Sequence, residues 1–274
     1  MRRVLSLALM LFCATAAHAG NVSWGVPPYT LGGPAAPSFP VYTDTVPNYV
    51  WFPFGLSNAT MTNTVATFDL GPRGLHATNL PTVASGPAQL SAVGLNGKTN
   101  YWYNFEGSDD KFRIGGTTNL NGTTQLTISA WIKVLNAPGT LAPIVEQRGS
   151  AVHLFTYHNS TPRYQLFMNG GSYTATNTVT TGTWHHVVAT YHNLPGAYDL
   201  FFYLDGGLIY SNDAAVASLT VDDYWYIGWD DFDASWLFKG EMDNLKLKSV
   251  AVPYSWVTNE FANTHPTNTY EVAP

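Results

Sequence analysis

Short apolar runs alternate with polar turns along most of this chain, and within the runs the alternation has the two-residue period of β-strands. Between residues 126 and 134, one face collects Leu126, Ile128, Ala130, Ile132 and Val134, and the other collects Thr127, Ser129, Trp131 and Lys133. The first face predicts a core-facing strand surface. Trp131 interrupts the polar face, so we expect a second apolar or aromatic surface near its ring.

Similar runs recur at short spacing, and helical periodicity is nearly absent. Besides the segment 126–134, the predicted strands are Tyr101–Phe105, Lys111–Ile114, Ala142–Glu146, Val152–Tyr157, Tyr164–Met168, Trp184–His192, Leu200–Leu204, Gly207–Ser211, Trp225–Gly228 and Gly240–Leu247. Asp205-Gly206-Gly207 predicts a hairpin turn, because glycine supplies the positive φ that a tight turn needs. The pattern predicts an all-β fold, a two-sheet antiparallel jelly-roll β-sandwich.

Four segments divide the chain. Residues 1–19 carry two arginines, an apolar run and a small-residue exit, which is typical of a secretory signal peptide. Residues 20–47 are rich in Pro and Gly and predict an extended arm or linker, residues 48–262 form the predicted jelly-roll domain, and residues 263–274 form a predicted flexible tail. We therefore expect a secreted protein, extracellular or at the cell surface, with the arm as a candidate for self-association.

Composition narrows the classes of partner. The formal net charge is −6, and it becomes −8 when Arg2 and Arg3 leave with the signal. This acidic balance disfavours a nucleic-acid partner. The single cysteine, Cys13, lies in the signal, so the mature chain is expected to have no disulfide. No later apolar run reaches the roughly 20 residues of a transmembrane helix.

Several motifs, in order, resemble the laminin G-like, or concanavalin A-like, lectin/glucanase domain family. They are Trp51-Phe52-Pro53-Phe54, the turn Asp69–Thr78, Gly94-Leu95-Asn96-Gly97, the segment Phe105–Phe112, the strand at 126–133, and the runs Thr183–Tyr191, Tyr203–Gly207, Tyr226–Gly228 and Phe238–Leu245. The resemblance implies a jelly-roll sandwich that works as a carbohydrate-binding or adhesion module. It also implies a short closing helix at Tyr254–Phe261, for which Ser255 is a plausible N-cap.

The resemblance further implies a structural calcium ion. Asp243 matches the aspartate that family members commonly use, and main-chain carbonyls of the Phe105-Glu106-Gly107 turn would complete the shell, so Asp243 and Gly107 are the candidate metal ligands. Calcium prefers six to eight hard oxygens, which such a set supplies. The alternative is that Asp243 accepts hydrogen bonds from nearby backbone N–H groups.

A cluster of tryptophans and aspartates is the candidate sugar site. Tryptophan faces can stack on a sugar ring while carboxylates bind its hydroxyl groups. The cluster comprises Trp225, Trp229, Asp230, Asp231, Asp233 and Trp236, with a glycan or cell-surface polysaccharide as the expected partner. The alternative interpretation is that these aspartates occupy ordinary turns and that Trp225 alternates into the core with Ile227.

Catalytic signatures are weak. The glucanase relatives carry Glu-x-Asp-x-x-Glu, and the nearest match, Glu241-Met242-Asp243-Asn244-Leu245-Lys246, ends in lysine. A lyase could use His153, Tyr157 and Arg163, which are grouped only in sequence. His185 and His186 are adjacent, so they point to opposite strand faces and do not predict a shared metal. We expect a non-catalytic binding module, with an assembly protein and a glycan-cleaving enzyme as the alternatives.

Overall fold

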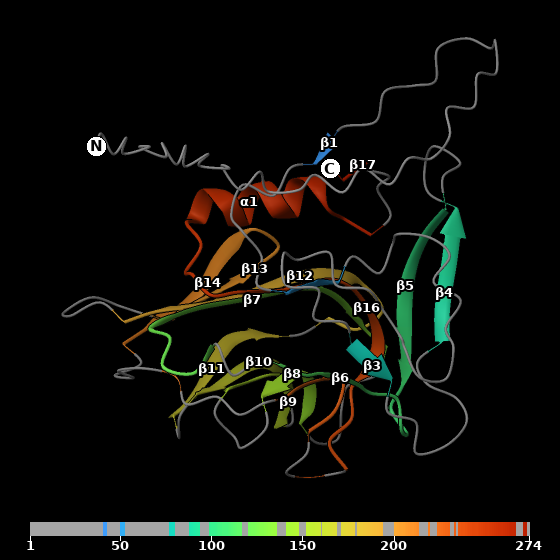
Figure 1. Cartoon of the computed structure of the whole chain (residues 1–274), viewed down its shortest axis with the longest axis horizontal. Coiled ribbons are helices and arrows are strands. Elements are labelled where there is room, and N and C mark those ends of the chain that lie inside the picture. The colour runs from blue at the N-terminus through green and yellow to red at the C-terminus, as the bar shows by residue number, and fades with distance from the viewer. Residues whose placement is uncertain are drawn as a thin grey trace, which may run out of the picture.

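Two antiparallel sheets stack face to face, and a helix lies against the outer face of the larger sheet (Figure 1). The structure is a computed structural model that describes residues 41–42, 50–52, 77–79, 88–93, 99–116, 120–135, 141–147, 152–159, 161–168, 171–178, 180–193, 200–213, 219, 224–230, 233, 235–266 and 271–272. The predicted all-β antiparallel sandwich is confirmed. The predicted signal peptide and residues 20–40 and 43–47 of the predicted arm lie outside the described residues.

The smaller sheet has seven strands in the order β11-β10-β9-β8-β15-β6-β3. Their bounds are β3 (Ala77–Asn79), β6 (Phe112–Ile114), β8 (Ala142–Gln147), β9 (Val152–Asn159), β10 (Thr161–Met168), β11 (Gly171–Thr178) and β15 (Trp225–Ile227). The pattern did not predict β11, whose sequence is mostly Thr, Ser and Asn. Since β15 inserts between β6 and β8, segments more than 100 residues apart become neighbours.

The larger sheet follows the order β14-β13-β12-β7-β16-β5-β4, with β2 paired to β16 beside this path. The strands are β2 (Val50–Phe52), β4 (Ala88–Val93), β5 (Thr99–Glu106), β7 (Gln125–Val134), β12 (Trp184–His192), β13 (Leu200–Leu204), β14 (Gly207–Asn212) and β16 (Lys239–Lys248). The predicted turn joins β13 to β14, and the positive φ of Asp205 (50°) and Gly206 (77°) is that of a type I′ hairpin.

The core lies between the two inner faces. Leu126, Ile128, Ala130, Ile132 and Val134 all belong to it, as the alternation predicted. They pack with aromatic side chains from both sheets, including Phe112 and Trp225 of the seven-stranded sheet. Because side chains alternate along each strand, the remaining residues of both sheets project onto the two outer faces.

Helix α1 (Tyr254–Asn263) provides the aromatic surface that Trp131 requires. The Phe261 ring stacks on Trp131 with centroids 5.7 Å apart, and Trp131 Nε1 donates to Thr264 Oγ1 at 2.9 Å. The ring of His186 lies on the same outer face, 5.1 Å from Trp131. The expectation from the strand pattern is therefore confirmed.

An ion pair is buried beneath the same helix. Lys246 Nζ donates to the Glu260 carboxylate at 2.6 Å, and both side chains are 0% exposed. The Asn244 amide donates to the same carboxylate oxygen at 2.8 Å. Burial raises the pKa of Glu260 well above its usual range. Helix α1 therefore depends on polar as well as apolar contacts with this face.

The helix boundary differs from the prediction. Pro253 is the N-cap and provides no side-chain hydrogen bond, while Ser255 lies in the first turn, where its carbonyl accepts from the Thr258 hydroxyl at 3.1 Å. Beyond the helix, β17 (Glu271–Val272) pairs in parallel with β1 (Val41–Tyr42). The predicted tail and the predicted arm thus each contribute one strand to a short ladder.

Candidate functional site

The three tryptophans of the predicted sugar cluster have different environments. Trp225 is completely buried in the core, so its ring is not offered to a ligand. Trp229 and Trp236 are partly exposed; Trp229 pairs with Leu237 in an isolated bridge after β15, and Trp236 directly precedes Leu237. The alternative interpretation, that Trp225 alternates into the core, is confirmed. Of the three tryptophans, Trp229 and Trp236 keep rings within reach of a ligand.

The aspartates of the cluster also differ. Asp230 is 0% exposed, and its carboxylate accepts the Asp233 N–H at 3.3 Å. Asp233 is partly exposed, and hydrogen bonds from the Ser235 hydroxyl and N–H lower its pKa. Asp231 lies outside the described residues. Within the described part of the loop, Asp233 is the carboxylate that a ligand could reach.

Two cations and three aromatic rings cluster on the outer face of the seven-stranded sheet, where four of these side chains are partly exposed and Tyr226 is 6% exposed. Lys111 Nζ lies 4.0 Å from the Trp229 ring centroid, and the Arg113 guanidinium carbon lies 4.7 Å from that of Tyr224. The Tyr226 ring meets Trp229 edge to face at 4.9 Å, and Tyr226 pairs with Arg113 in the strand register. We call these five residues the basic–aromatic patch.

Simple alternation produces this patch. Phe112 and Ile114 of β6 are buried in the core, so Lys111 and Arg113 project outward, and the burial of Trp225 and Ile227 turns Tyr224 and Tyr226 the same way. The sequence pattern alone did not predict this patch. The motifs Lys-x-Arg and Tyr-x-Tyr were a usable signal, but they are separated by more than 100 residues of sequence.

The turn between β5 and β6 lies beside the predicted sugar loop. Gly228 has φ +78°, and a Cβ there would lie 2.5 Å from the Phe105 ring and 3.4 Å from the Asp110 carbonyl. The Asp110 carboxylate accepts the Glu106 N–H. Burial raises the pKa of Asp110, although this hydrogen bond opposes the shift. Asp110 therefore stabilises the turn on which Lys111 is placed.

The two predicted calcium ligands are not brought together. Lys239 of β16 pairs with Glu106, whereas Met242 pairs with Tyr103, so Asp243 lies about 16 Å along the strands from Gly107 at roughly 3.3 Å per residue. One calcium ion needs its ligands at about 2.3–2.6 Å. The Asp243 carboxylate instead accepts the Asn244 N–H at 2.7 Å, as the alternative interpretation proposed.

Within the described part of the seven-stranded sheet, acidic residues do not form a pair on the outer face. Within the described part of that sheet, Glu146 is the carboxylate on this face, and it is 0% exposed. Tyr157 pairs with Arg163, but His153 is four positions away on β9, opposite Glu146, at about 13 Å from Tyr157. No group of three His, Cys, Asp or Glu suited to a metal ion occurs among the described residues.

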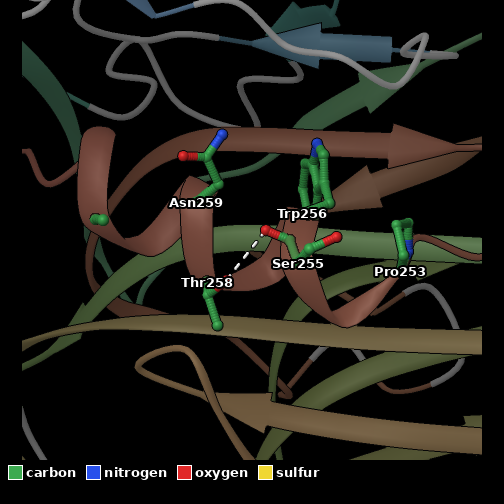
Figure 2. A pocket seen from close by; sticks show the side chains of 6 residues that line it. Pro253, Ser255, Trp256, Thr258 and Asn259 are labelled. Carbon is green, nitrogen blue, oxygen red and sulfur yellow. Dashed lines mark hydrogen bonds between the residues drawn. The ribbon is translucent and has the colours of Figure 1, made fainter.

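A second surface feature is a hollow of about 450 Å³ beside α1 (Figure 2). It is lined by Pro253, Ser255, Trp256, Thr258, Asn259 and Ala262. These side chains offer hydroxyl and amide groups but no titratable group, so the chemistry available there is limited to neutral hydrogen bonding and packing. The described residues contain no helix that is long and apolar enough to cross a membrane.

The two-sheet antiparallel sandwich, with one outer face covered by a helix and the other bearing the partly exposed rings of Tyr224 and Trp229, defines an all-β class of protein. The sequence model described as the concanavalin A-like lectin/glucanases superfamily matches residues 106–257, more than half of the chain. The chain belongs to this superfamily. No curated protein sequence matches it.

Solved structures share the fold at low identity. Domain 4 of AbnA, an extracellular GH43 arabinanase from Geobacillus stearothermophilus solved in complex with arabinotriose, matches with a TM-score of 0.54 and 17% identity, over 78% of this chain and 97% of that chain. The Trypanosoma rangeli sialidase matches with a TM-score of 0.56 and 16% identity, over 80% of this chain. That match covers 33% of the sialidase chain, so this chain spans about a third of it.

Proposed function

We propose that this protein is a secreted, non-catalytic carbohydrate-binding module that binds polysaccharide on the outer face of its seven-stranded sheet, around Trp229. One observation carries the proposal: the partly exposed Trp229 ring, with Tyr226 at its edge, lies on the face that α1 does not cover. Aromatic rings of this kind stack on sugar rings and retain a polar edge for hydroxyl groups. Asp233 and Trp236, both partly exposed, follow Trp229 in the chain before β16.

Two further observations support binding rather than cleavage. The superfamily includes lectins as well as glucanases, and domain 4 of the arabinanase was solved with arabinotriose bound. Retaining glycosidases need two carboxyl groups about 5–5.5 Å apart. Among the described residues of the seven-stranded face, Glu146 has no carboxylate neighbour in the strand register, because Tyr226 and His153 lie beside it.

The test is binding of a panel of polysaccharides, arabinan included, by affinity electrophoresis and calorimetry. Trp229→Ala should weaken binding at least about tenfold, because an aromatic side chain that becomes buried against its ligand contributes strongly to recognition. Tyr254→Ala is the matched control, since Tyr254 is 55% exposed on the helix side. Equal losses in both variants would contradict the proposed site.

Reducing-end release from each polysaccharide that binds is measured in parallel. The proposal requires no release above the background of the buffer. Turnover that survives repurification and disappears in Glu146→Gln would replace the binding-module proposal with an enzyme.

A further inference from the structure

The two cations of the basic–aromatic patch lie over aromatic rings. Among the described residues, neither Lys111 nor Arg113 forms an ion pair, and the close partner of each is an aromatic ring. Both side chains are partly exposed. An exposed guanidinium that lies over a ring is held in place while its N–H edges remain available for acceptors.

Three of the described acids around the patch are withdrawn from the surface, whereas Asp109 and Asp233 are partly exposed. Glu146 and Asp230 are 0% exposed, and Asp110 is 3% exposed with its carboxylate on the Glu106 N–H. Asp109 is partly exposed. Burial lowers the pKa of Lys111, and the negative charge of Asp109 opposes part of that shift. A ligand approaching this face therefore meets the Arg113 cation more directly than any of these buried carboxylates.

We propose that the basic–aromatic patch selects an anionic polysaccharide, with Arg113 pairing with a carboxylate or sulfate group and the partly exposed Trp229 ring lying against the sugar rings. The planar guanidinium matches a carboxylate or sulfate with two parallel hydrogen bonds, which lysine cannot reproduce. Lys111 and Arg113 lie two residues apart, about 6.6 Å along the strand, so both can face one polymer chain. This inference rests on the proposed function and adds the class of sugar.

The net charge, −6 for the full chain and −8 without Arg2 and Arg3, does not oppose this selection at short range. Repulsion between exposed charges is largely screened beyond about 8 Å at physiological ionic strength, whereas a direct guanidinium contact is within that distance. Binding of an anionic polymer should therefore be salt-sensitive but present at 0.15 M, and it should weaken as ionic strength rises further.

The experiment uses the full chain and three probes in affinity electrophoresis: polygalacturonate for carboxylates, dextran sulfate for sulfates, and dextran as the neutral counterpart. We expect at least one anionic polymer to bind, and dextran to bind at least about tenfold more weakly, as for loss of a hydrogen bond to a charged group. Preference for one anionic polymer over the other identifies the source of the anion.

Variants locate the interaction. Arg113→Gln should reduce anionic binding about tenfold or more, Lys111→Gln should reduce it less, and Arg113→Lys should restore only part of the loss because the planar fork is missing. Lys239→Gln removes the same charge from an exposed position on the other sheet and should bind like the wild type. Thermal unfolding of each variant confirms that the fold is retained.

The outcomes separate the two proposals. Binding of neutral polysaccharides that depends on Trp229 but not on Arg113 would overturn the anionic selection and leave the proposed function standing. Anionic binding that is equal in wild type and Arg113→Gln would also overturn it. Failure of every polysaccharide to bind would overturn the proposed function itself.

Discussion

Charged side chains on the outer faces of the two sheets differ in burial and in contact partners. Beneath α1, Lys246 and Glu260 are 0% exposed and satisfy each other, with Asn244 as a third partner. On the seven-stranded sheet, Lys111 and Arg113 are partly exposed and rest on aromatic rings. The first arrangement fixes an element of the fold, whereas the second keeps hydrogen-bonding capacity available to a ligand.

The contrast also explains why one face can be structural despite its polar sequence. Lys248 is 0% exposed, with its Nζ 4.8 Å from the Trp256 ring, and Ser129 shares a 2.9 Å hydrogen bond with His186. Buried polar groups are tolerated when their hydrogen bonds are satisfied. A face of this kind looks solvent-exposed in the sequence until the element that covers it is known.

The largest loss of stability is expected when the buried Glu260 carboxylate is removed. Glu260→Ala leaves the Lys246 ammonium buried without its partner, and it should lower the free energy of unfolding by about 3–5 kcal/mol, measured by urea unfolding at pH 7. The double variant Lys246→Met/Glu260→Leu should recover most of that loss, because paired apolar groups can replace a buried ion pair.

Ser255→Ala is the matched control on the same helix and should change the free energy of unfolding by no more than about 0.5 kcal/mol. An N-cap serine would cost about 1 kcal/mol, so this variant also checks the corrected helix boundary. A loss below 1 kcal/mol in Glu260→Ala would show that the face under α1 does not depend on its ion pair.

A smaller effect is expected from the protonation of His186. Burial first, and Lys246 second, lower its pKa from 6.5 to about 3. The stability that neutral His186 contributes is therefore complete above pH 6.5 and is lost as the pH falls towards 3. Between pH 7 and 5 the loss from this group should be about 2 kcal/mol, at 1.36 kcal/mol for each pH unit below 6.5.

The measurement compares urea unfolding of the wild type and His186→Gln across this pH range. Glutamine does not titrate and can keep a hydrogen bond with Ser129, so its stability should fall less steeply with decreasing pH. Parallel pH profiles for the two proteins would contradict the assignment of a neutral, buried His186.

The sequence predicted elements whose alternation is strong. The face made by Leu126 to Val134 required a buried strand, and Trp131 required a covering ring, which Phe261 supplies. Strand β11 was not predicted because its residues Gly171–Thr178 are small and polar, and it pairs with β10 at the edge of the sheet. Edge position and pairing are tertiary facts that local propensity does not contain.

The candidate site was predicted only in part. Trp229 and Asp233 lie where a ligand could reach them, but the register separates Asp243 from Gly107 and buries Trp225. Lys111 and Arg113 gained significance only when β6 paired with β15, which brings Tyr226 beside Arg113. The sequence shows which residues share a strand face, but not which distant strands become neighbours.

The smallest effect on stability is expected for the two cations of the basic–aromatic patch. Arg113→Gln and Lys111→Gln should each lower the free energy of unfolding by no more than about 1 kcal/mol, because an exposed cation–π contact contributes about 0.5–1 kcal/mol. Urea unfolding of these variants beside Glu260→Ala measures the contrast directly. Losses of 3 kcal/mol or more would mean that these cations hold the fold together, as Lys246 does. If the free energy of unfolding changes little while binding of the anionic polymer weakens, the charges on this face serve ligand binding rather than the fold.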